Sequence, residues 1–113
     1  MKASGHQRID QRSIALHRAV AEKLRARPEL LDRARGNIGR WYPGAGAARP
    51  YLDQWLRILD QPLEEVLAAM VDDGEKMTAL RQSSPFTGIL EPAERWAIYR
   101  RFASRGSPRG SSE

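Results

Sequence analysis

The chain has 113 residues, a formal net charge of +5 and no cysteine, and 41% of its residues are hydrophobic. This length and apolar content fit one globular domain, and the missing cysteine excludes disulfides, thiolate metal sites and cysteine nucleophiles. No apolar run is long enough to span a bilayer, and no signal-peptide hydrophobic region precedes the first charged segment, so we expect a soluble, cytoplasmic protein with no membrane partner.

The first third of the chain predicts two amphipathic helices with a period of 3.6 residues. Residues 1–8 are predicted to form a flexible arm. The first helix is expected to begin near Asp10, a good N-cap, and to end before Pro28. The second opens at Pro28, carries an apolar stripe that ends at Trp41, and stops at a Pro-Gly break.

Two further helices are predicted in the middle of the chain. One runs from Pro50 to about Asp60, and the next opens at Pro62 and ends or kinks at 72–74. The first of these two has a broad apolar face that consists of Tyr51, Leu52, Trp55, Leu56 and Leu59.

The remaining segments complete an all-α prediction. A short helix is followed by a turn-rich loop over 83–88, and a last helix starts at 91–94. Residues 104–113 are of low complexity and are predicted to be a disordered tail. We therefore expect one helical domain over 9–103, a compact bundle of about five to six short helices. The last helix is expected to present Trp96, Ile98, Tyr99 and Phe102.

The charge is segregated along the chain. Residues 1–50 carry a net charge of +7, residues 51–90 carry −4, and residues 91–113 carry +2. The basic first half favours a partner with phosphates, whereas the acidic middle favours a cationic partner surface.

No constellation of catalytic or metal-ligating residues is recognisable. Neither His6 nor His17 has a second ligand at metal-binding spacing, and no Gly-x-Ser-x-Gly elbow occurs. The glycines of 44–46 are not followed by the Lys-Ser/Thr pair of a phosphate-binding loop. We therefore expect no catalytic residue, no metal and no cofactor, and a protein that is not an enzyme.

Nucleic-acid binding is one reading of the basic half. The second and third helices can be drawn as a helix-turn-helix, although their connection is longer than the usual turn and the third helix has a polar face that is not basic. Scattered solubilising charge is the simpler interpretation. The candidate phosphate contacts are Arg12, Arg18, Arg25, Arg33, Arg35 and Arg40.

Protein binding is the other reading, and it uses different residues. Tyr42 lies beside the Pro-Gly break and Phe86 beside Pro85, and aromatic residues next to loops are favoured anchors of interfaces. The acidic middle is a solvated helix face, a patch that binds a partner or, as the least favoured alternative, a site of carboxylate catalysis. Its candidate residues are Glu64, Glu65, Asp72, Asp73 and Glu75.

Two stretches of the sequence carry a family resemblance. They are 9–17, with the arginine-rich segment that continues to 37–41, and 80–96, which reads LRQSSPFTGILEPAERW. Over these stretches the chain resembles a small antitoxin of a bacterial toxin–antitoxin module, with a nucleotidyltransferase-type toxin as one candidate partner.

The resemblance implies a function by stoichiometric binding. An antitoxin of this kind neutralises its cognate toxin by occluding the active site, and a nucleotidyltransferase toxin has a basic, metal-containing cleft for nucleotide and RNA. The basic half would then complete the interface or bind operator DNA. The alternative function of the chain is that of a small helix-turn-helix-like DNA-binding transcriptional repressor. A homo-oligomer is a further possible assembly. The residues expected to face the toxin are the five acidic residues, Ser84, Pro85 and Phe86 of the 83–90 loop, and Tyr42.

Overall fold

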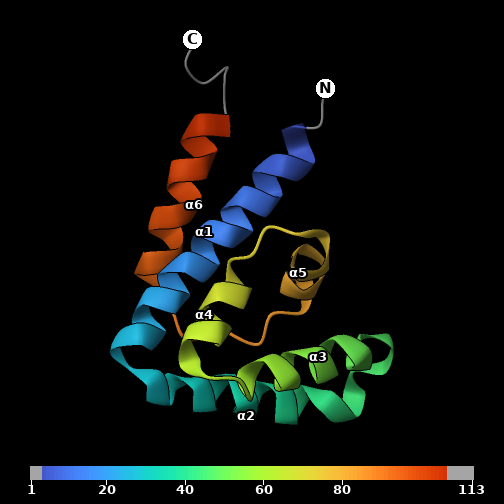
Figure 1. The fold of residues 1–113 in the computed structure, drawn as a ribbon. Helices are drawn as coiled ribbons and strands as arrows, with labels where there is room; N and C mark the ends of the chain where they lie inside the picture. The colour runs from blue at the N-terminus through green and yellow to red at the C-terminus, as the bar shows by residue number, and fades with distance from the viewer. Residues whose placement is uncertain (1–3, 107–113) are drawn as a thin grey trace.

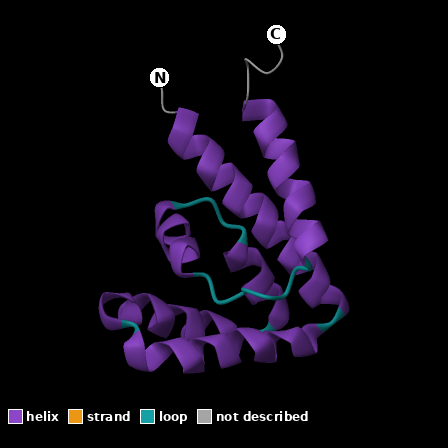
Figure 2. Cartoon of the chain, turned by 180° about the vertical axis from the view of Figure 1, so that it is seen from behind, coloured by secondary structure: helices purple, strands orange, loops and turns teal. Residues whose placement is uncertain are grey.

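The computed structural model describes residues 4–106, with side chains over 10–103, and all regular elements in this part are helical (Figures 1 and 2). The predicted all-α domain of about six short helices is therefore confirmed. Its α-helices are α1 (Ser4–Ala26), α2 (Leu31–Trp41), α3 (Arg49–Leu59), α4 (Leu63–Met70), α5 (Glu75–Leu80) and α6 (Pro92–Gly106), and its 3-10 helices are η1 (Pro28–Leu30), η2 (Tyr42–Gly44), η3 (Gly46–Ala48) and η4 (Arg81–Ser83).

Prolines mark most of the helix starts. Pro28 opens the 3-10 turn that leads into α2, Pro50 is in the first turn of α3, Pro62 directly precedes α4, and Pro92 is the first residue of α6. A proline at these places loses no hydrogen bond, because the first amide groups of a helix have no acceptor within it. The four predicted helix starts are thus confirmed.

The helices form two groups that meet at the core. α2 and α3 lie side by side in opposite directions across one end of the molecule. α1 runs toward this end and α6 runs away from it (Figure 1). α1 packs against both α4 and α6, and α3 packs against α2, α4 and α5. α4 and α5 therefore fill the space between the two groups.

The core is centred on Trp55 of α3, which is fully buried. Its indole Nε1 donates a hydrogen bond of 2.8 Å to the carbonyl of Leu80, and its ring meets the ring of Phe86 edge to face with centroids 5.4 Å apart. The ring contact packs Phe86, and with it the segment that follows η4, against the core.

The ends of the domain differ from the predicted boundaries. α1 begins at Ser4 rather than near Asp10, so 4–8 belong to a helix, and α6 continues to Gly106. Asp10 does not cap the helix; its carboxylate lies 3.4 Å from Nη2 of Arg81. The rest of the predicted arm and tail, 1–3 and 107–113, lies outside the described residues.

Four large apolar side chains that the helix patterns assigned to apolar faces are exposed. Trp41, Tyr51 and Leu56 are 36–41% exposed, and Trp96 is 58% exposed. The error has a geometric cause: a helix packed on one core buries a narrow stripe, and the flanking positions of that stripe stay in water. On α3 the buried positions are Leu52, Trp55 and Leu59.

Candidate protein-interaction surface

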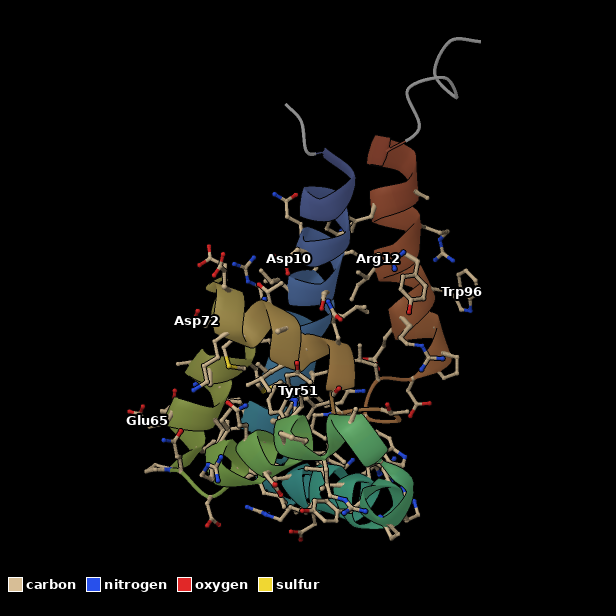
Figure 3. The ribbon with its side chains drawn as sticks, turned by 90° about the vertical axis from the view of Figure 1, so that its right-hand side faces the viewer. Asp10, Arg12, Tyr51, Glu65, Asp72 and Trp96 are labelled. Carbon is tan, nitrogen blue, oxygen red and sulfur yellow. The ribbon has the colours of Figure 1, made fainter. Side chains whose placement is uncertain are left out.

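The predicted acidic residues lie on α4, on the turn that follows it and at the first residue of α5. All five are exposed, and we call them the acidic ridge. In Figure 3 the labelled Glu65 and Asp72 lie on one side of the molecule, and Trp96 lies on the opposite side. The members of the acidic ridge are Glu64, Glu65, Asp72, Asp73 and Glu75.

Two of these carboxylates have partners within the fold. Glu64 accepts a hydrogen bond of 2.8 Å from Nη1 of Arg25, and Asp72 accepts one of 2.7 Å from the backbone amide of Gly74. Within the described side chains, no hydrogen bond or ion pair engages the other three. The ridge therefore presents three uncompensated carboxylates, which belong to Glu65, Asp73 and Glu75.

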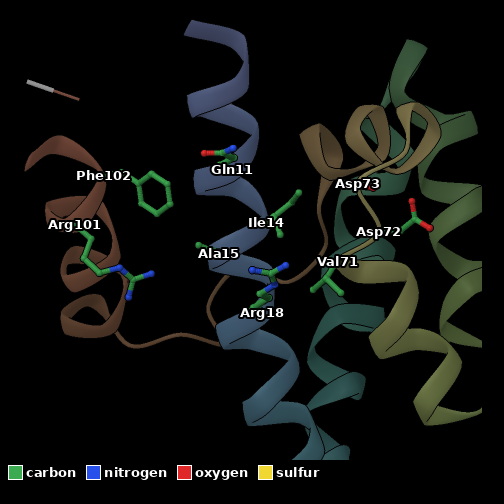
Figure 4. A pocket seen from close by; sticks show the side chains of 9 residues that line it. All are labelled: Gln11, Ile14, Ala15, Arg18, Val71, Asp72, Asp73, Arg101 and Phe102. Carbon is green, nitrogen blue, oxygen red and sulfur yellow. The ribbon is translucent and has the colours of Figure 1, made fainter. Parts of the chain in front are cut away.

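An open groove of about 660 Å³ borders the ridge. α1 forms its floor, α6 lies on one side with Arg101 and Phe102, and the turn after α4 lies on the other with Asp72 and Asp73 (Figure 4). Arg18 projects from the floor. The groove thus carries positive charge at its centre and at one wall, and negative charge at the other wall.

The structure corrects the role predicted for the 84–86 segment. Phe86 is 4% exposed and Pro85 is fully buried, so neither offers a surface to a partner. Phe86 is held by edge contacts with the rings of Trp55 and His17, and the Ser84 hydroxyl lies 2.9 Å from Nε2 of His17. Phe86 and Pro85 therefore belong to the core and not to the candidate surface, whereas Ser84 is partly exposed and its place in a toxin interface stays a prediction.

Tyr42 is half-buried and stabilises the connection between α2 and α3. Its hydroxyl donates a hydrogen bond of 2.9 Å to Asp53, and the guanidinium of Arg49 lies over its ring, 5.1 Å from the centroid. The hydrogen bond to the Asp53 carboxylate raises the pKa of Tyr42. These contacts stabilise the connection locally, and the place of the partly exposed Tyr42 in a toxin interface stays a prediction.

Most of the candidate phosphate-binding arginines make hydrogen bonds inside the fold. Four of the six donate to a carboxylate, an amide oxygen or a backbone carbonyl, so contact with phosphate would compete with these bonds. They are Arg25 with Glu64, Arg33 with the carbonyl of Gly88, Arg35 with Asp32 and the carbonyl of Leu59, and Arg40 with Asn37.

The helix-turn-helix considered as an alternative for α2 and α3 is not formed. The two helices run side by side in opposite directions, and two 3-10 turns, η2 and η3, join them (Figures 1 and 2). A helix-turn-helix has a shorter turn and a steep crossing that lets its second helix enter the DNA groove. These two helices form a hairpin instead, because the connection allows them to pack along their length.

An exposed aromatic patch was not predicted as a surface. Trp96 and Tyr99 meet edge to face with centroids 5.6 Å apart, and the guanidinium of Arg12 lies 5.0 Å from the Tyr99 ring centroid. We call Arg12, Trp96 and Tyr99 the aromatic patch. The spacing of three between the two aromatic residues on α6 is the sequence signal that places them side by side.

Among the described residues, no group of three His, Asp or Glu side chains could hold a metal ion, and no helix is long and apolar enough to cross a membrane. Comparison of the chain with protein-family models, with curated proteins and with solved structures found no significant match.

Proposed function

We propose that this chain is an antitoxin that binds a cognate toxin enzyme and silences it by covering the active site. The observation that carries the proposal is the set of three exposed, unpaired carboxylates on the acidic ridge. A cationic surface that approaches these unpaired carboxylates interacts with them favourably, which stabilises the complex. The resemblance of 9–17 and 80–96 to small antitoxins supports the same function.

A substrate cleft for nucleotides and RNA has the complementary chemistry. Such a cleft presents arginine and lysine side chains that bind phosphate oxygens, and carboxylates make the same charge-assisted hydrogen bonds. The ridge occupies the positions of the substrate phosphates and excludes them. Opposite charges also accelerate the encounter, so the association rate falls as salt is added.

The test begins with capture of the partner. The full chain is immobilised, proteins are captured from a lysate of the native host, and the purified partner is assayed for enzymatic activity while the chain is titrated into it. We expect inhibition that is complete at a fixed molar ratio. A captured protein whose activity the chain leaves unchanged would contradict the proposal. Salt-sensitive binding of operator DNA, with no captured protein, would favour the repressor instead.

A matched pair of variants tests the role of the ridge. The first variant replaces the unpaired carboxylates by amides, as Glu65→Gln, Asp73→Asn and Glu75→Gln. The control makes the same change in charge at three exposed acidic residues outside the ridge, as Glu22→Gln, Asp60→Asn and Glu91→Gln. Only the ridge variant is expected to lose inhibition at low concentrations of the chain. Equal inhibition by both variants would remove the ridge from the interface.

A further inference from the structure

A buried guanidinium lies where α1, α4 and α5 meet. The Arg81 side chain is 1% exposed, and its Nη1 donates hydrogen bonds of 3.1 and 2.7 Å to the carbonyls of Met70 and Asp72. Its Nη2 has only long contacts of 3.4 Å, with the carboxylate of Asp10 and the hydroxyl of Thr78. Nε has no hydrogen-bond acceptor. A buried cation usually has a close anion and a full set of acceptors, so this one is under-compensated.

Arg81 lines an open pocket of about 390 Å³ between α1 and the chain that follows η4. Arg95 of α6 also lines it, and no carboxylate does. Leu16, Val20 and Leu90 give the pocket an apolar side. We call this pocket the arginine pocket, because the cationic groups of Arg81 and Arg95 lie beside its apolar side.

His17 adds no charge to the arginine pocket near neutral pH. Burial lowers its pKa, and the positive charge of Arg81 acts in the same direction, against the opposing effect of the hydrogen bond to Ser13. Because the carbonyl of Ser13 can only accept, Nδ1 carries the proton over a distance of 2.8 Å. Nε2 then accepts from the Ser84 hydroxyl. The neutral imidazole is fully hydrogen-bonded, so the two arginines define the charge of the arginine pocket.

We propose that the arginine pocket binds a small free organic carboxylate with an apolar body. The carboxylate accepts from the Arg95 guanidinium and is attracted by the positive charge of the buried Arg81, whose Nε–H has no acceptor within the fold, and the apolar body lies on Leu16, Val20 and Leu90. The volume is at the lower end for small-molecule sites, which fits a ligand of this size. This site is independent of the acidic ridge and of any toxin.

The test uses hexanoate, with hexanol as a neutral analogue of the same length and sodium chloride to match ionic strength. Binding to the full chain is followed by calorimetry and by the ¹⁵N–¹H resonance of Arg81 Nε. We expect hexanoate to bind at millimolar or lower concentrations, to shift the Nε resonance, and to bind at least tenfold more tightly than hexanol. Equal affinities for the two ligands would overturn the proposal, and so would the absence of binding at hexanoate concentrations up to about 50 mM.

Two variants on the same helix separate the pocket from general surface charge. Arg95→Gln is expected to weaken hexanoate binding about tenfold, because it removes one charge-assisted contact. Arg100→Gln makes the same change at an exposed residue that does not line the pocket and should leave binding unchanged. Arg81 itself is not substituted, since it holds the end of α4. Unchanged binding in Arg95→Gln would contradict the assigned contact.

Discussion

Replacement of Phe86 by alanine tests whether the 84–86 segment is part of the core. The side chain is 4% exposed, and its ring has edge contacts with Trp55 at 5.4 Å and with His17 at 5.8 Å. Removing a buried phenyl ring costs about 3–5 kcal/mol, through the lost transfer free energy and the cavity left behind. Because this ring is almost fully buried and has two aromatic partners, we expect a loss of about 4 kcal/mol.

The assay is urea unfolding of the wild-type chain and of Phe86→Ala at 25 °C, followed by circular dichroism and tryptophan fluorescence. A loss of about 4 kcal/mol also corresponds to a fall in Tm of ~15 °C for a domain of this size. The control is Trp96→Ala, which removes an exposed ring and should change stability by less than about 1 kcal/mol. A Phe86→Ala variant that loses less than about 1 kcal/mol would show that the segment is not packed as described.

Three further predictions concern single contacts. Burial lowers the pKa of His17, so below about pH 6.5 the unfolded chain takes up a proton at this residue that the folded chain excludes. The free energy of unfolding should therefore fall as the pH drops from about 6.5 toward the pKa of the folded state, by at most ~1.4 kcal/mol per pH unit. In urea titrations at several pH values, His17→Gln should reduce this pH dependence of the free energy of unfolding. An unchanged pH dependence would show that His17 does not cause it. Asn37→Ala should destabilise the chain by about 2 kcal/mol, because the buried amide donates to two carbonyls of the loop that contains Phe86; a thermal melt that matches the wild type would contradict this. The Arg25–Glu64 pair is 50% and 71% exposed, so a double-mutant cycle should give a coupling of no more than about 0.5 kcal/mol, and a coupling above 1 kcal/mol would show that solvent screens it less than expected.

The sequence correctly predicted those features of the fold that depend on a single residue or on residues close together in the chain. Pro28, Pro50, Pro62 and Pro92 marked helix starts because the ring fixes one backbone angle and removes one amide proton at the residue itself. The acidic ridge was found for a similar reason. Its members lie within twelve residues of one another, so α4, the turn after it and the first residue of α5 place them together.

Contacts distant in sequence decided the parts that were wrong. Phe86 follows a proline in a turn-rich loop, and this local sequence is as compatible with an interface anchor as with a core residue. The contact with Trp55, 31 residues away in the sequence, places the ring in the core, and no local pattern contains that information. On α6 the apolar pattern did not reveal that Trp96 lies outside the buried stripe.

The arginine pocket was missed for the same reason. His17, Arg81 and Arg95 come from α1, η4 and α6, and only the packing of these elements brings them to one pocket. In the sequence Arg81 is one arginine among many, and its burial depends on the end of α4, where it meets two carbonyls. No spacing rule connects the three positions.

The affinity of the ridge variant for the captured partner is the decisive test of the proposal that the acidic ridge binds a cationic surface of a toxin. Three exposed ion pairs at about 0.5–1 kcal/mol each predict that the ridge variant binds about 10–150-fold more weakly than the wild type at 0.15 M salt. The three-residue control should stay within about twofold, and the difference should shrink at 0.5 M salt. Equal affinities of the wild type, the ridge variant and the control at both salt concentrations would contradict the claim.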